Sequence, residues 1–435
     1  MIGLMLVFFL WSICLTPSFQ SYASLPSELR LFSGQSKQLH FTMPVNAQVT
    51  VKDLDIVAIN GKVKHSLQVD LHEPLALQSL QAGKTEMSVR LFGAIPIKTL
   101  KVNVIPDLKV IPGGQTIGVK IKSAGILVVG HHLVTVGQGQ KTSPAEQADV
   151  RLGDLITKVD GVRINDVAKV ADLVNAAGKR NGEMKLTILR NGTEIERRIR
   201  PALDMEERVY RLGVYIRDSA AGVGTLTFYA PEHGIYGALG HIITDLDTHT
   251  PIIPGGGEIL NSSVTSISKS QNGSPGEKRA HLFNDQKVLG NIEKNTQFGI
   301  FGKMYHPPGN AAYREALPVA FAEDVHNGPA QILTVIDGQK VEKFDIEIVH
   351  TSRQNTPTTR GIVIRITDPR LLNKTGGIVQ GMSGSPIIQD GKIVGAVTHV
   401  LINDPKSGYG CYIEWMLQDA GILLKSGANR ELKVG

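Results

Sequence analysis

The hexapeptide Gly381-Met382-Ser383-Gly384-Ser385-Pro386 constrains the fold of this chain most, because it sets a serine among small residues just before two apolar runs. Glycines let the backbone bend tightly there and leave the serine hydroxyl open to a carbonyl group. The N–H groups of Gly381 and Ser383 can converge on one position, which would form an oxyanion hole for acyl transfer. The runs at residues 386–388 and 392–397 predict two strands joined by a tight turn, which give the serine a rigid base.

A histidine and an acidic residue elsewhere in the chain complete a candidate catalytic set. His241 follows Gly237-Ala238-Leu239-Gly240, which are mostly small residues, and Asp368 lies directly before a proline. The order along the chain is therefore His, Asp, Ser. The loop around Ser383 resembles the Gly-Asp-Ser-Gly-Gly-Pro nucleophile loop of chymotrypsin-like serine proteases, with methionine and a second serine as departures.

The composition describes an ordinary folded protein. A chain of 435 residues predicts two to four domains, and its formal charge of +6 is modest. Basic residues are scattered, so we expect no nucleic-acid partner. His131 and His132 are adjacent, and the spacings typical of metal ligands do not occur, so neither a metal site nor a cofactor is predicted.

The chain begins with an apolar run at residues 2–15, which has the length of a signal-peptide core and is short for a bilayer-spanning helix. Ser21-Tyr22-Ala23 follows, and we expect cleavage after Ala23. No Lys or Arg precedes the run, so retention as a membrane anchor is the alternative for residues 1–24. Cys411 would be the only cysteine of an exported chain, so no intramolecular disulfide is expected.

Three further regions are predicted, which together make a mainly β, multidomain protein. Residues 25–105 show short alternating segments and an Asn60-Gly61 turn, which indicate a β-sandwich-like region. Proline and glycine at positions 112–114 mark a boundary, and residues 106–205 carry a predicted helix at 167–177 and a hairpin around Asn191-Gly192. Residues 206–435 start with strand-like pieces joined by small residues, which suit a closed β-barrel.

Residues 106–205 resemble a circularly permuted PDZ domain of the kind found beside bacterial proteases. The likeness rests on Leu152-Gly153-Asp154 and Val159-Asp160-Gly161. In PDZ domains, the loop before the ligand-binding strand offers backbone N–H groups to a peptide carboxylate. The resemblance places that loop at four residues: Thr116, Ile117, Gly118 and Val119. A PDZ domain that only packs against its neighbours is the alternative.

The chain as a whole resembles the stage IV sporulation protein B peptidases of spore-forming bacteria. The most specific motifs are Tyr215-Ile216-Arg217-Asp218-Ser219-Ala220-Ala221-Gly222, Tyr236-Gly237-Ala238-Leu239-Gly240-His241, Ile366-Thr367-Asp368-Pro369-Arg370-Leu371-Leu372 and Gly377-Ile378-Val379-Gln380-Gly381-Met382-Ser383-Gly384-Ser385-Pro386. The resemblance implies a chymotrypsin-like serine endopeptidase domain in residues 206–435. It makes Ser383 the nucleophile, His241 the general base and then acid, and Asp368 the orienting carboxylate.

The same resemblance implies a signalling role in sporulation. The enzyme would be exported by the forespore across its inner membrane into the intermembrane space, where it cuts its own N-terminal region. It would then cleave the regulatory subunit of an intramembrane metalloprotease complex near the membrane, which triggers pro-sigma-K processing in the mother cell. A quality-control protease of the HtrA type and a non-catalytic PDZ adaptor are the alternatives. In HtrA proteases the PDZ domains follow the protease domain, whereas here the PDZ-like part comes first.

Rivals remain for two catalytic roles. Asp245 and Asp247 follow His241 closely, and either could replace Asp368, which lies only fifteen positions before Ser383 and departs from the wide spacing of chymotrypsin-like enzymes. His399 is a competing base, although we expect it to shape the substrate cleft.

Overall fold

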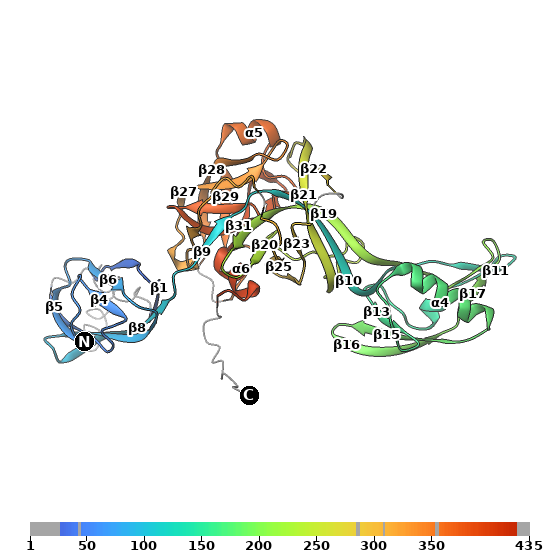
Figure 1. Cartoon of the computed structure of the whole chain (residues 1–435), viewed down its shortest axis with the longest axis horizontal. Coiled ribbons are helices and arrows are strands. Elements are labelled where there is room, and N and C mark those ends of the chain that lie inside the picture. Colours follow the sequence, from blue (N-terminus) through green and yellow to red (C-terminus); the bar gives the residue numbers. More distant parts are fainter. Residues whose placement is uncertain (1–26, 42–44, 284–287, 308, 353–355, 424–435) are drawn as a thin grey trace, which may run out of the picture. The chain divides into compact units, whose positions relative to one another are not determined.

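The computed structural model describes residues 27–41, 45–283, 288–307, 309–352 and 356–423 (Figure 1). The predicted signal peptide or anchor, residues 1–24, lies outside these ranges. Within them, no helix combines the length and the apolar character needed to span a membrane. The chain forms two compact units, Met1–Leu108 and Lys109–Gly435.

The first unit contains two small sheets that share one core. The five-stranded sheet has the order β1-β8-β7-β3-β5, and the three-stranded sheet has the order β2-β6-β4. The strands are β1 (Glu28–Phe32), β2 (Ser36–Leu39), β3 (Asn46–Val51), β4 (Val57–Ile59), β5 (Ser66–Asp70), β6 (Leu75–Ser79), β7 (Gly83–Leu91) and β8 (Ile95–Ile105). Alternate residues of β3, such as Val49, are buried, so the period-two pattern marks the inner face as predicted.

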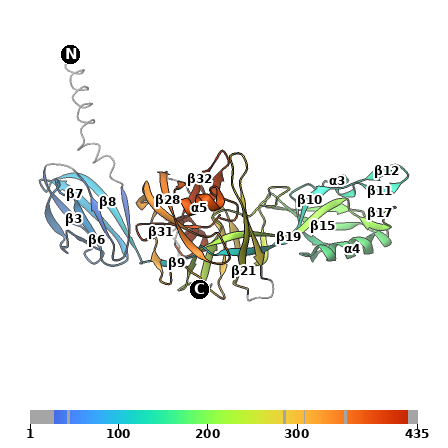
Figure 2. The ribbon, with the colours of Figure 1, turned by 90° about the horizontal axis from the view of Figure 1, so that it is seen from above.

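Two long strands run through the second unit. β10 (Thr116–His131) pairs antiparallel with β19 (Val214–Ala230) along most of their length, with a register shift between Lys122 and Leu127. Figures 1 and 2 show both strands passing from the part around α4 into the part around β21. One half of each strand therefore belongs to a PDZ-like sheet and the other half to the peptidase region.

The PDZ-like part is a sheet of order β16-β15-β13-β10-β19 together with helix α4 (Figure 1). The hairpin turn at Asn191-Gly192 has positive φ at both residues, as predicted. α4 begins after Asp166, whose side chain accepts a hydrogen bond from the Ala168 N–H, and it buries Val170 and Val174. The elements are β11 (Val134–Gly137), β12 (Gln140–Thr142), α3 (Pro144–Gln147), β13 (Leu155–Val159), β14 (Val162–Arg163), α4 (Val167–Lys179), β15 (Met184–Arg190), β16 (Thr193–Ile199), β17 (Ala202–Asp204) and β18 (Val209–Arg211).

The peptidase region combines a curved sheet with a closed barrel. The curved sheet is formed by β9 (Lys109–Pro112), the paired halves of β10 and β19, β20 (Ile235–Ala238), β21 (Pro254–Ser268), β22 (Glu277–Leu282), β23 (Gly290–Asn291), β24 (Lys294–Thr296), β25 (Gly299–Lys303) and β26 (Leu317–Pro318). The barrel closes in the order β27-β28-β29-β32-β31-β30, which confirms the predicted barrel. Its elements, with the flanking helices, are η1 (Ala322–Asp324), β27 (Gly328–Val335), β28 (Val341–Thr351), β29 (Ile362–Ile366), α5 (Pro369–Thr375), β30 (Pro386–Gln389), β31 (Lys392–Leu401), β32 (Asp404–Tyr412) and α6 (Ile413–Ala420).

Candidate active site

The loop around Ser383 is held against β19 by two buried threonines. Thr225 Oγ1 donates to the Gly381 carbonyl at 2.7 Å, and Thr227 Oγ1 donates to the Gly384 carbonyl at 2.8 Å. Gly381 and Gly384 have φ of 92° and 94°, a conformation that favours glycine. A Cβ on Gly384 would also lie 2.1 Å from the Thr225 carbonyl oxygen. The small residues of the hexapeptide are therefore required by both backbone conformation and close approach.

Two N–H groups of this loop have no acceptor among the described residues. The N–H groups of Gln380, Met382 and Gly384 all donate to backbone carbonyls. Neither the Gly381 N–H nor the Ser383 N–H donates to any acceptor in the part of the chain that the structure describes. Both residues are partly exposed to solvent. These are the two donors that the sequence proposes for an oxyanion hole, and their bonding capacity is available for one.

The Ser383 hydroxyl is held by the neighbouring strand β31. It donates to the Thr398 carbonyl at 3.0 Å. Thr398 is buried, and its own hydroxyl lies 2.8 Å from the Thr359 carbonyl oxygen. The serine side chain is thus anchored on β31 at Thr398, the residue directly before His399.

His241 reaches the same place from β20. Leu239 and Gly240 have φ of 74° and 73°, so the chain turns sharply between the end of β20 and the histidine. A Cβ on Gly240 would lie 3.0 Å from the Thr398 side chain, which shows how closely this turn approaches β31. The rings of His241 and His399 lie with their centroids 5.4 Å apart. The structure therefore brings Ser383, His241 and His399 together around Thr398.

The two histidines differ in their electrostatic setting. Burial lowers the pKa of His241 below its usual value, although a hydrogen bond between Nδ1 and the Ile242 carbonyl opposes this. Desolvation by surrounding protein, followed by the charges of His241 and Arg360, lowers the pKa of His399 to about 4. Both shifts favour the neutral imidazole, the form that can accept a proton, so the pKa values do not decide between His241 and His399 as the base.

Asp368 is engaged away from His241 in this structure. Its carboxylate caps α5 by accepting the Arg370 N–H at 2.9 Å, and it pairs with the Arg370 guanidinium at 2.8 Å. This pairing is the main cause of the lowered pKa of Asp368. Across the described ranges, no carboxylate is hydrogen-bonded to His241. The role of Asp368 in a triad stays a prediction.

Asp245, one of the two rivals, has a structural role that the sequence did not indicate. It is buried, and its carboxylate accepts the N–H groups of Asp247 and Thr248 together with the Arg217 guanidinium. Asp247 also pairs with Arg217, at 2.8 Å. Both carboxylates thereby order the loop that follows His241.

The prediction that residues 116–119 form the peptide-binding loop of the PDZ-like part is wrong. Thr116, Ile117, Gly118 and Val119 are all buried within β10. All four pair with β19 on one side, and residues 117–119 pair with β21 on the other, so neither edge of this central part can accept a further strand. A short run of small and β-branched residues suits a central strand as well as a loop, and the sequence could not distinguish them.

An open strand edge lies elsewhere in the PDZ-like part. Residues 214–222 of β19 pair only with β10 among the described residues. α4 adjoins this segment, since the Val167 N–H donates to the Asp218 carboxylate at 3.2 Å. A strand edge beside a helix is a geometry that accepts a peptide as an added strand. The motif beginning at Tyr215 was recognised from the sequence, but no signal assigned it this position.

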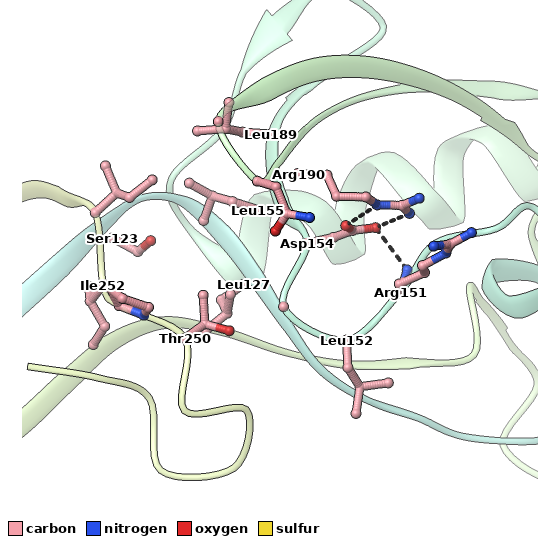
Figure 3. A pocket seen from close by; sticks show the side chains of 15 residues that line it. Ser123, Leu127, Arg151, Leu152, Asp154, Leu155, Leu189, Arg190, Thr250 and Ile252 are labelled. Carbon is pink, nitrogen blue, oxygen red and sulfur yellow. Dashed lines mark hydrogen bonds and ion pairs between the residues drawn. The ribbon is translucent and has the colours of Figure 1, made fainter.

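A cavity of about 420 Å³ lies where the PDZ-like part meets the loop at residues 250–253 (Figure 3). Figure 3 shows Asp154 between Arg190 and Arg151 at one side of it. Asp154 is buried, accepts the Arg190 guanidinium at 2.7 Å and also accepts the Arg151 N–H. The charges here neutralise one another, and the residues that line the cavity include none of the candidate catalytic residues.

Cys411 is not a second nucleophile. It is fully buried in β32, and burial raises the pKa of its thiol to about 12, so the reactive thiolate is suppressed. The described residues also contain no group of three His, Cys, Asp or Glu side chains that could hold a metal ion.

Crystal structures of the Rv3671c protease from M. tuberculosis are similar to this chain. The active form is 16% identical to this chain, with a TM-score of 0.25. The match covers 48% of this chain and 76% of the Rv3671c chain. The inactive form is also 16% identical, with a TM-score of 0.26. Here the match covers 46% of this chain and 84% of the Rv3671c chain.

Two family models match the chain. Residues 116–200 match the PDZ domain, and residues 208–417 match SpoIVB peptidase S55. The second match spans the free N–H groups at Gly381 and Ser383 and the two histidines beside them. Residues 208–417 therefore belong to the SpoIVB S55 peptidase family, and the chain is a serine endopeptidase with a PDZ domain ahead of its peptidase domain.

Proposed function

We propose that this serine endopeptidase is a sporulation signalling protease. It is exported by the forespore into the intermembrane space, cuts its own N-terminal region and cleaves the regulatory subunit of an intramembrane metalloprotease, which triggers pro-sigma-K processing in the mother cell. The observation that carries the proposal is the match of residues 208–417 to SpoIVB peptidase S55. That match includes His241, Asp368 and Ser383, the three residues to which the family resemblance assigns catalysis.

The geometry around Ser383 supports a mechanism of acyl transfer. The Ser383 hydroxyl leaves the Thr398 carbonyl, transfers its proton to His241 and attacks the carbonyl carbon of the scissile peptide bond. The negative charge on the substrate oxygen is stabilised by the N–H groups of Gly381 and Ser383. His241 then donates the proton to the leaving amine, and water releases the acyl group from Ser383 by the reverse sequence of proton transfers.

The family resemblance proposes Asp368 as the carboxylate that orients His241. In that role, the carboxylate would have to exchange its bonds with Arg370 for one to the histidine. If it keeps those bonds, Asp368 contributes by fixing the start of α5, whose end leads into the segment before Ser383. The two roles make different predictions for an Asp368→Asn variant.

The PDZ-like part is proposed to present a peptide segment to the peptidase. The open edge of β19 at residues 214–222 and the adjoining α4 support this role, because an extended segment can pair there as a strand. The N-terminal region of the protein and the metalloprotease regulator are the proposed ligands.

The alternative of an HtrA-type quality-control protease is disfavoured by domain order, since the PDZ match at 116–200 precedes the peptidase match at 208–417. The assignment to a family of peptidases disfavours a non-catalytic adaptor.

The test compares the purified full-length wild type with Ser383→Ala. Both are incubated for hours and sampled by intact-mass spectrometry, alone and with a reconstituted metalloprotease regulator. We expect discrete N-terminal fragments and one or a few cuts in the regulator, with the wild type only. Cleavage that persists in Ser383→Ala would refute the catalytic assignment. Broad digestion of unfolded casein, with the folded regulator left intact, would support the quality-control alternative instead.

A further inference from the structure

A buried lysine lies directly beneath the oxyanion loop. Lys278 is only 1% exposed and belongs to β22. A Cβ placed on Gly381 would lie 3.1 Å from Lys278 Cβ and 3.5 Å from its Cδ, so the lysine stem runs along the face of this glycine. The Lys278 N–H also donates to the Gln380 carbonyl at 2.9 Å. Both the backbone and the side chain of Lys278 therefore support the residues that precede Ser383.

The connection between β21 and β22 holds the rest of this segment in the same way. The Gln380 N–H donates to the Gly276 carbonyl at 2.8 Å, and Ser270 Oγ donates to the Ile378 carbonyl at 2.7 Å. Ser270 Oγ also accepts the Gly276 N–H. The segment that ends at Gln380 is thus fixed before the loop begins, and Lys278 then contacts the first residue of the loop, Gly381.

Among the residues that the structure describes, the Lys278 amine has one hydrogen-bond partner, which is neutral. Nζ donates to Thr334 Oγ1 at 2.7 Å, and Thr334 is itself fully buried. Within the described residues, no carboxylate forms an ion pair with Lys278. Burial alone lowers the pKa of the amine to about 7. An apolar residue would avoid the cost of burying an unpaired ammonium group, so fold stability does not account for a lysine here.

The proposed formation of an oxyanion beside Gly381 does account for a lysine at position 278. The Gly381 N–H is one of the two free donors, and in the proposed mechanism the substrate oxygen becomes negative beside it. The contacts of the lysine stem with Gly381 place the buried amine in the surroundings of this developing charge, and little water screens charges in a dry interior. A developing oxyanion would also favour the protonated form of the lysine.

We infer that Lys278 is a positioning residue of the oxyanion site: anchored on Thr334, it fixes Gly381 with its N–H free and supplies positive charge that stabilises the oxyanion. This inference rests on the proposed role of Ser383 as nucleophile. Lys278 is not the base that activates the serine, since the Ser383 hydroxyl donates to Thr398 and the amine donates to Thr334.

The test uses Lys278→Met, which keeps an unbranched stem and removes the charge. The probe is a fluorophosphonate, whose reaction with a catalytic serine develops an oxyanion without requiring a known substrate. The control is Lys269→Met, which removes an exposed lysine from the same β21–β22 region. We measure the labelling rate at saturating probe, the probe concentration for half-maximal rate and the melting temperature, for full-length proteins.

We expect Lys278→Met to slow labelling about 10-fold to 100-fold, as for the loss of one oxyanion-stabilising interaction. The half-maximal concentration and the melting temperature should not fall, and Lys269→Met should match the wild type. Wild-type labelling by Lys278→Met would overturn the inference, as would a slower rate accompanied by a lower melting temperature and weaker probe binding. If Ser383 is not the nucleophile, the outcome is different: either the wild type does not react with the probe, or Ser383→Ala reacts as the wild type does.

Discussion

The Ser383 hydroxyl donates to the Thr398 carbonyl at 3.0 Å, in a site where the His241 ring approaches from another strand. The same carbonyl belongs to the residue against which Gly240 turns, so one backbone position of β31 organises both candidate catalytic side chains. The serine must exchange this acceptor for His241 before it can be deprotonated. Apo sites often hold such bonds in an unreactive alignment that tightens only when substrate binds.

Substitution of Asp368 separates its two possible roles. Asn at this position can still cap α5, but it cannot stabilise an imidazolium ion. If Asp368 completes a triad, Asp368→Asn should lower the labelling rate by about 10⁴-fold while the melting temperature changes little. Arg370→Ala is the matched control, because it releases the carboxylate without removing it. A rate for Asp368→Asn within a few fold of the wild type would assign Asp368 to the helix cap alone.

Removal of the Thr225 hydroxyl beneath the serine loop should lower both the stability of the protein and its labelling rate. Thr225→Val leaves the Gly381 carbonyl without a buried donor, at a cost of about 1–3 kcal/mol in unfolding free energy. We expect the labelling rate to fall at least about 10-fold, because a displaced Gly381 misplaces one oxyanion donor. Chemical denaturation and labelling kinetics measure the two effects. The matched control is Thr265→Val, since Thr265 Oγ1 donates to the Arg279 carbonyl at an exposed position.

Much of the fold followed from local patterns. The hairpin at Asp390-Gly391 forms as predicted, with φ of 49° and 73°, and the helix predicted at 167–177 extends over Val167–Lys179. These elements depend on residues close together in sequence, whose turn chemistry and periodicity are readable directly.

What the sequence could not indicate depends on distant pairing. Thr116–Val119 become a central strand only because β21, more than 130 residues later, covers their second edge. Lys278 lies between two charged neighbours in a polar stretch, and only its packing against Gly381 shows that it is buried. The N–H groups of Gly381 and Ser383, which the sequence proposes as oxyanion donors, have no acceptor among the described residues, and their role as donors stays a prediction.

Activity should persist below the usual histidine range. Burial lowers the pKa of His241, and the base must be neutral to accept the Ser383 proton. The labelling rate should therefore be constant near neutral pH and fall only as the pH drops through a value below 6.5. A profile between pH 4.5 and 8, with His399→Gln as control for the second imidazole, locates this midpoint. A midpoint above 6.5 would contradict the assignment of His241 as a buried base.

The free energy of unfolding should depend on pH above 7 because Lys278 is buried. The folded-state pKa of Lys278 is about 7, whereas the unfolded chain retains this proton up to about 10.5. Between these values the unfolded state binds more protons, so the free energy of unfolding should rise with pH, by at most about 1.4 kcal/mol per unit. Lys278→Met removes this dependence and should be more stable than the wild type at pH 7, since it no longer buries a charge. Urea denaturation at pH 7, 8 and 9 measures both effects, with Lys269→Met expected to keep the wild-type slope. Equal slopes for the wild type and Lys278→Met would show that the amine does not lose its proton in this range.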